Sequence, residues 1–129
     1  MKQLLCLFFY TTMSSLINFR VYNINNEPLV YQNCCPGVSK IVVYPEDVAV
    51  NECTNFTAAS ARSDLFNIGE CSWSLKNKLL QIVWHVDYHL DETYFGVVET
   101  NDTHSFIQYW NEGTTYDVVV LIGKNQAGI

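Results

Sequence analysis

The stretch LQIVWHVDYHL, residues 80–90, decides the fold class of this chain. Its even positions are all apolar or aromatic, whereas four of its five odd positions are polar or charged. A period of two sustained over this length is typical of a β-strand that has one face on a core and the other in water. We therefore predict a half-buried strand over residues 80–90.

Shorter stretches rich in β-branched and aromatic residues lie on either side of it, at residues 40–44, 94–100, 105–110 and 116–122. Turn-forming clusters separate them, at Pro45-Glu46-Asp47, Asn101-Asp102 and Asn111-Glu112-Gly113. Short strands with frequent turns favour an antiparallel sandwich or barrel. We predict an all-β chain folded as an antiparallel β-sandwich. Residues 57–65 are the one stretch whose composition suggests a helix. The asparagine-rich residues 20–32 are consistent with an edge strand or a loose arm.

The first nineteen residues, MKQLLCLFFYTTMSSLINF, have the layout of a signal peptide: one lysine, an apolar run and a stretch of small residues. The apolar run over residues 4–10 is shorter than the roughly 20 residues that a membrane-spanning helix needs. No A-x-A triplet marks the cleavage point, which we place between Ser14 and Phe19. The sequence thus predicts a signal peptide over residues 1–19, one domain over residues 20–129, and a secreted, extracellular protein.

Cysteine usage agrees with a secretory route. Cys6 would leave with the signal peptide, and four cysteines would remain. An even number in a small secreted chain suits disulfides, and adjacent cysteines rarely bridge each other. Cys34 and Cys35 are therefore each predicted to pair with one of Cys53 and Cys71, and two pairings stay open. A zinc site would need a second cysteine or histidine close to Cys53 or Cys71, and none has that spacing.

Two triplets match the N-glycosylation sequon, Asn55-Phe56-Thr57 and Asn101-Asp102-Thr103. In a secreted chain such triplets mark exposed positions that carry glycans. We predict glycosylation at Asn55 and Asn101.

Charge and aromatic content narrow the range of candidate binding partners. The chain has 13 acidic and 7 basic residues, and the basic ones are scattered. Because no basic patch could neutralise several phosphates, nucleic acid and anionic surfaces are poor ligands. We expect an extracellular protein or a carbohydrate as partner, and neither nucleic acid nor a membrane. The tryptophans Trp73, Trp84 and Trp110 could line a carbohydrate or lipid site, although a β-core also needs such side chains.

The segment His89-Leu90-Asp91-Glu92-Thr93-Tyr94-Phe95-Gly96 follows a spaced pattern of aromatic, aromatic and glycine, with His89 in the first aromatic position. This resembles the βγ-crystallin family, and the resemblance covers residues 41–122. It implies two Greek-key motifs, a positive φ at Gly96 and the Tyr94 ring packed over that glycine. The first motif departs from the family pattern at Ala49 and Asn51. The hydroxyl ligand of calcium-binding members is missing near residues 76–81 and 116–121, so no calcium is expected.

His85, Asp87 and His89 project from one face of the predicted strand at successive steps of about 7 Å. Two imidazoles and a carboxylate are plausible ligands for a transition metal. That spacing is wide for one ion, however, and we interpret the three residues as a solvent-exposed strand face. No cofactor is expected.

Function is the least determined property at this level. We predict a non-enzymatic extracellular interaction protein or effector, with no catalytic residues. The alternative is a small secreted hydrolase of the ribonuclease type, since fungal guanyl-specific ribonucleases are also acidic, tyrosine-rich proteins with two disulfides. Its acid and base would come from His85, His89, His104 and Glu99. Phosphoryl transfer also needs a cation near the developing charge, and Arg62 would have to supply it.

Overall fold

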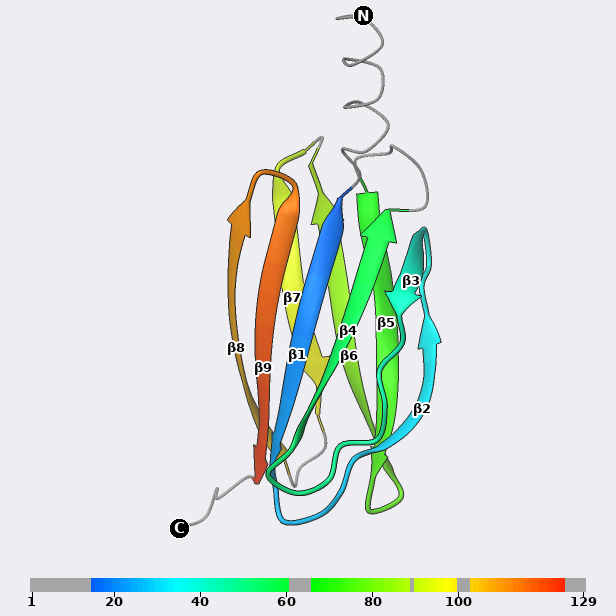
Figure 1. Ribbon diagram of the computed structural model, residues 1–129, viewed down its shortest axis with the longest axis vertical. Coiled ribbons are helices and arrows are strands. Elements are labelled where there is room, and N and C mark those ends of the chain that lie inside the picture. The colour runs from blue at the N-terminus through cyan, green and yellow to red at the C-terminus, as the bar shows by residue number, and fades with distance from the viewer. Residues whose placement is uncertain (1–14, 61–65, 89, 100–102, 125–129) are drawn as a thin grey trace, which may run out of the picture.

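The computed structural model describes residues 15–60, 66–88, 90–99 and 103–124. Two sheets pack face to face as a sandwich (Figure 1), with the strand orders β3-β4-β1-β9-β8 and β2-β5-β6-β7. Over the described residues the strands are β1 (Leu16–Ile24), β2 (Val30–Cys35), β3 (Ser39–Val43), β4 (Cys53–Ser60), β5 (Phe66–Leu75), β6 (Lys78–Asp87), β7 (Glu92–Val98), β8 (Thr103–Glu112) and β9 (Thr115–Lys124). The predicted all-β sandwich is confirmed.

One pair of neighbours departs from an antiparallel sandwich, because β1 runs parallel to β9. The remaining neighbours in both sheets are antiparallel. The strand nearest the N-terminus therefore lies beside the strand nearest the C-terminus, in the middle of the five-stranded sheet.

The alternation over residues 80–90 is confirmed for most of its length. Leu80, Ile82 and Trp84 are buried between the sheets, and Gln81 and Val83 lie on the other side of β6. The strand begins two residues earlier than the pattern and ends at Asp87. The shorter predicted stretches correspond to β3, β7, β8 and β9.

Residues 57–60 are not helical as their composition suggested; they are the second half of β4. Ala58 belongs to the core between the sheets, and Ala59, on the opposite side of β4, is also buried. Residues 61–65 lie outside the described part of the chain.

The asparagine-rich segment is neither an edge strand nor a loose arm in its first part, because residues 20–24 belong to the central strand β1. The strand starts at Leu16, and Ile17 and Phe19 are fully buried in the core. The packed domain thus includes residues 15–19, which the sequence had assigned to the signal peptide. Residues 1–14, where the rest of that predicted peptide falls, lie outside the described residues.

These contacts predict where the chain is cut if a signal peptide is removed. The backbone carbonyl of Ser15 accepts a hydrogen bond from Ser60 N at 3.0 Å, and its hydroxyl lies 2.7 Å from the Tyr88 hydroxyl. Cleavage after Phe19 would delete half of β1 and two core side chains. We expect the mature protein from a eukaryotic host to begin at or just before Ser15, as read by intact mass and N-terminal sequencing. A mature N-terminus at Arg20 on a folded protein would contradict this assignment.

Aromatic rings fill the core between the sheets. Phe19 stacks on Phe56 with ring centroids 4.3 Å apart, and both rings contact Trp84. Phe95 meets Phe19 edge-on at 6.0 Å. Since these side chains come from both sheets, the aromatic cluster joins the two layers.

A buried amide adds a polar link between the layers. Asn67 of β5 is fully buried, and its Oδ1 accepts hydrogen bonds from the Ser39 hydroxyl and from Trp84 Nε1 at 3.0 Å. Its Nδ2 donates to the Ala58 carbonyl at 3.1 Å and to Ser15. Because the partners lie on or beside both sheets, Asn67 fixes their relative position as well as meeting its own hydrogen-bonding needs.

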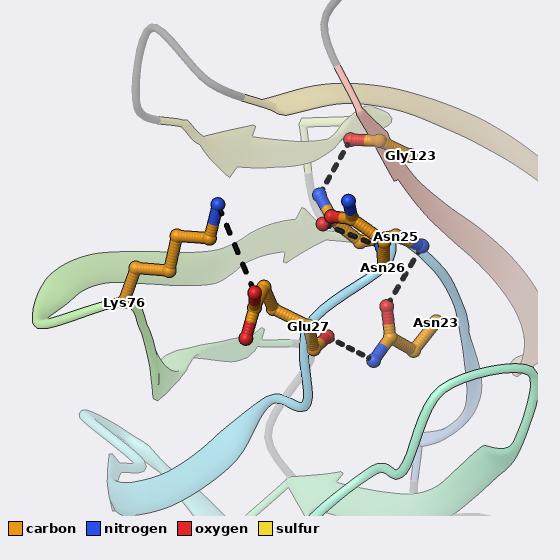
Figure 2. Close-up of polar contacts among 6 residues, drawn as sticks. All are labelled: Asn23, Asn25, Asn26, Glu27, Lys76 and Gly123. Atoms are coloured by element: carbon orange, nitrogen blue, oxygen red, sulfur yellow. Dashed lines mark hydrogen bonds and ion pairs between the residues drawn. The ribbon is translucent and has the colours of Figure 1, made fainter.

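A second asparagine network holds the loop after β1 (Figure 2). Buried Asn23 donates from Nδ2 to the carbonyls of Glu27 at 2.8 Å and Val48 at 3.0 Å, and its Oδ1 accepts from Asn25 N. Asn25 Nδ2 in turn donates to the Gly123 carbonyl at 3.3 Å. These bonds tie the loop to the end of β9 and so fix the lower end of the sheet in Figure 1.

The segment with the βγ-crystallin pattern lies in and before β7. The Tyr94 ring packs over Gly96, so closely that a Cβ there would meet the ring. Gly96 pairs with Val83 within the sheet and is not one of the residues with positive φ, which include Gly37 and Gly113. The βγ-crystallin resemblance itself stays a prediction.

Candidate functional site

The solvent side of the five-stranded sheet, called here the outer face, gathers side chains from four strands. The strand register places them in rungs that run across β8, β9, β1 and β4. The four rungs are Trp110–Asp117–Asn18–Thr57, Gln108–Val119–Arg20–Asn55, Phe106–Leu121–Tyr22–Cys53 and, without a β4 member, His104–Gly123–Ile24.

The first two rungs form a shallow depression of about 220 Å³, called here the central hollow. Val119 lies in its floor, and Trp110, whose side chain is 52% exposed, lies at its β8 side. The other outer-face residues that line it are polar or charged: Asn18, Arg20, Asn55, Thr57 and Asp117.

Hydrogen bonds orient the polar groups of the central hollow. Thr57 Oγ1 donates to Asn18 Oδ1 at 3.0 Å, and Asn18 Nδ2 donates to Asp117 Oδ1 at 3.4 Å. Arg20 Nε donates to Asn55 Oδ1 at 3.3 Å. Oriented amide, carboxylate and guanidinium groups beside an exposed indole suit a ligand that carries hydroxyl groups and a flat apolar face.

Arg20 keeps its charge in this setting. Its hydrogen bond with the Tyr22 side chain, together with nearby negative groups such as Asp117, raises the pKa of the guanidinium above its ordinary value. Asp117 partly balances that charge, so the central hollow presents both signs side by side.

The last two rungs form a second depression, called here the end groove, with a volume of about 270 Å³. Leu121 and Gly123 lie along β9 between Ile24 of β1 and Phe106 of β8. Ile24 is 56% exposed and Phe106 is 67% exposed. A Cβ on Gly123 would lie 3.4 Å from the His104 carbonyl oxygen and 3.5 Å from the Ile24 side chain, so the glycine lies close beside both neighbouring strands. His104 and Lys124 add polar groups at the same end.

The cysteines form one of the predicted bridges. Cys34 of β2 is bonded to Cys71 of β5, which settles the partner of Cys34 that the sequence left open. Cys35 and Cys53 are exposed free thiols in the structure, so the second predicted bridge is not formed. Cys35 ends β2 in one sheet and Cys53 begins β4 in the other, and this placement separates them.

Of the two predicted glycosylation sites, Asn55 lies within the described residues and Asn101 does not. Asn55 is exposed on the outer face, beside the central hollow. Asn101 lies outside the described residues, as do its neighbours Thr100 and Asp102.

The predicted metal-ligand row is not assembled over the described residues. His85 lies on the outer side of the four-stranded sheet, near Glu92 and Tyr94. Asp87 is buried at the end of β6 and accepts a hydrogen bond from Leu90 N at 3.1 Å, so the expectation that it shares a solvent-exposed face was wrong. His89 lies outside the described part of the chain. Where the chain is described, no three His, Cys, Asp or Glu side chains form a metal-binding group.

The candidate acid–base residues also lie apart. His104 belongs to the outer face of the five-stranded sheet, whereas His85 lies on the opposite side of the sandwich. The Glu99 carboxylate accepts hydrogen bonds from the Ser105 backbone and hydroxyl, at the start of β8. Arg62 and His89 fall outside the described residues. His85, His104 and Glu99 therefore form no common cleft.

The sequence did not single out Ile24 and Phe106, which line the end groove, and it named Trp110 only among the aromatics. One signal was present at residues 106–110, where apolar side chains occupy both faces of the predicted strand. A strand with one face in water should be apolar on one face only. Apolar residues on both faces of an edge strand indicate an exposed apolar surface.

Comparison with known proteins adds a likeness of fold. No protein-family model and no curated protein sequence matches the chain. The crystal structure of the lipid binding protein Nakanori superposes with a TM-score of 0.71, over 94% of this chain and 76% of that one, at 11% sequence identity. At this identity the likeness concerns the fold alone. Over the described residues, no helix is long and apolar enough to cross a membrane.

Proposed function

We propose that this protein is a secreted, non-enzymatic binding protein that attaches to neutral lipid surfaces through the end groove. The observation that carries the proposal is the exposure of Ile24 and Phe106 on either side of an apolar floor at one end of the sheet. Large exposed apolar side chains grouped at one place mark interaction sites more often than scattered ones.

The exposed area is enough for reversible attachment. Fully burying a side chain of this size is worth about 1.5–3 kcal/mol, and Ile24 and Phe106 are each about half exposed or more. Together they would supply roughly 2–3 kcal/mol. Since 1.4 kcal/mol corresponds to a tenfold change in affinity, their loss should weaken attachment by about 30- to 150-fold.

The net charge of the protein determines which kind of lipid surface it can approach. With a formal net charge of −6 the protein is repelled by anionic membranes. A neutral or zwitterionic surface carries no such penalty and needs no basic patch. The sequence-based expectation of no membrane partner rested on charge, and the apolar end groove is the reason for departing from it.

Two further observations support the proposal. The Nakanori structure, described as that of a lipid binding protein, has the same fold over nearly the whole of this chain. The Cys34–Cys71 bridge is consistent with an oxidising, extracellular setting. The ribonuclease alternative gains no support, because its candidate residues in the described chain do not converge.

Flotation with neutral phosphatidylcholine vesicles tests this function. We expect the unmodified protein to float with the vesicles and the double variant Ile24→Ser/Phe106→Ser to lose about 30- to 150-fold in partitioning. The matched control is Val38→Ser/Val42→Ser, which removes two valines that are also about half exposed but lie in or next to β3. The control should bind like the unmodified protein. Equal losses in both variants, or no flotation of the folded protein, would refute the proposal.

A further inference from the structure

The sequon Asn55-Phe56-Thr57 coincides with the central hollow, the other depression of the outer face. Asn55 and Thr57, the first and third residues of one sequon, both line the central hollow. We propose that the central hollow holds the inner sugars of an N-glycan attached to Asn55. This inference goes beyond lipid binding and rests on the secretory route alone.

The attachment atom is free to react. Arg20 Nε donates to Asn55 Oδ1, the amide oxygen, which glycosylation leaves unchanged. Among the residues that the structure describes, no hydrogen bond is formed by Asn55 Nδ2. In the transfer step Nδ2 forms a bond to C1 of an oligosaccharide, the bond from C1 to the diphosphate of a lipid-linked donor breaks, and the amide proton is lost with the lipid diphosphate as leaving group. The bond from Arg20 then holds the modified amide on the outer face.

Asn55 lines the β4 side of the central hollow, which extends from there across the outer face. From β4 it crosses β1 and β9 to Trp110 on β8, three strand spacings or about 14 Å. A sugar linked to Asn55 would first meet Arg20 and Asn18. The sugars that follow would pass over Val119 beside Asp117 and reach the indole of Trp110.

The chemistry along this path suits saccharides. Sugar hydroxyls both donate and accept, and they find an acceptor in Asp117 and donors in Arg20. The apolar face of a sugar ring can stack on the indole of Trp110, which is exposed. Among the described residues, no aromatic ring already stacks on this indole. Covalent attachment raises the local concentration of these sugars far above that of any free saccharide.

The proposed glycan leaves the end groove open. Trp110 and Phe106 are four residues apart along β8, or about 13 Å. The two depressions therefore occupy successive halves of the outer face, and the glycan and a lipid surface can be accommodated together.

Tryptophan fluorescence can report whether the glycan covers the central hollow. Trp73 and Trp84 are buried, so iodide can quench the fluorescence of Trp110 but not that of the other two. The experiment uses protein secreted by a eukaryotic host as the Asn101→Gln variant, so that Asn55 is the remaining predicted acceptor. Mass spectrometry first establishes that Asn55 is occupied. An endoglycosidase then trims the glycan to its first sugar.

We expect iodide quenching to increase on trimming, because the sugars that cover Trp110 are removed. The further variant Trp110→Phe should show little quenching before or after trimming, which assigns the signal. Intact and trimmed proteins should have the same circular dichroism spectrum. An unoccupied Asn55, or an occupied one whose removal leaves quenching unchanged, would overturn the inference. Either result leaves the flotation test of lipid binding unaffected.

Discussion

Replacing Asn67 by alanine is expected to lower the free energy of unfolding by about 3–5 kcal/mol. The substitution leaves the Trp84 indole N–H without its partner in the interior, and it removes the bonds of Asn67 to the Ala58 carbonyl and to the Ser39 hydroxyl, which keeps its bond to the Ile68 carbonyl. Each buried polar group left unsatisfied costs about 1–3 kcal/mol, and the missing side chain leaves a small cavity. Urea unfolding followed by circular dichroism measures the change.

Asn111→Ala is the matched control for this substitution. Asn111 is exposed near the end of β8, and its amide makes one bond to the Gly113 carbonyl. Exposed positions usually change stability by about 0.5 kcal/mol or less. If the two variants unfolded at the same urea concentration, the amide of Asn67 would not be the link between the sheets that its contacts indicate.

Removing the Cys34–Cys71 bridge should have a similarly large effect. The bridge closes a loop of 37 residues, for which the loss of chain entropy in the unfolded state predicts a stabilisation of about 3–4 kcal/mol. The variant Cys34→Ala/Cys71→Ala should therefore unfold at a much lower urea concentration. Mass mapping under non-reducing conditions should find this bridge in the unmodified protein.

Cys35→Ala/Cys53→Ala supplies the comparison, because both thiols are exposed and unbonded in the structure. It should unfold within about 0.5 kcal/mol of the unmodified protein. A large destabilisation from this pair would instead show that Cys35 and Cys53 are bridged in the secreted protein, in line with the second pairing expected from the sequence.

The strands that could be predicted from the sequence are those in which apolar residues alternate within one short stretch of the chain. In β6 the alternating residues Leu80, Ile82, Trp84 and Val86 face the same core, so their period of two identifies the strand without knowledge of its partners. Residues 57–60 were wrongly predicted to be helical because alanine has a high intrinsic helix propensity in isolated peptides. In the fold these residues pair with both β1 and β3 in an extended strand, so tertiary context overrides their local propensity.

The start of the domain was hidden for a different reason. Leu16, Ile17 and Phe19 continue the apolar composition of the predicted signal peptide, and composition cannot separate a leader from a core strand. Their assignment to β1 depends on parallel pairing with β9, about a hundred residues away. No pattern within residues 1–24 carries that information.

The outer face could not be predicted as a site because its residues are distant in sequence. The central hollow combines residues 18–20, 55–57, 110 and 117–119. The sequon at Asn55 was identifiable, but its position opposite Trp110 follows from the strand order. The row of His85, Asp87 and His89 was interpreted as a solvent-exposed strand face, and this was wrong for Asp87, which is buried and accepts a hydrogen bond at the end of its strand.

Amide hydrogen exchange with and without neutral phosphatidylcholine vesicles tests the proposed attachment most directly. If the end groove contacts the lipid surface, exchange should slow at residues 103–107 and 121–124 when vesicles are added, and stay unchanged at residues 39–43 of β3. Contact with lipid would shield the amides at the beginning of β8, an edge strand, from water. Protein that floats with the vesicles yet shows slowed exchange at β3 or β7 instead of at the end groove would contradict the account.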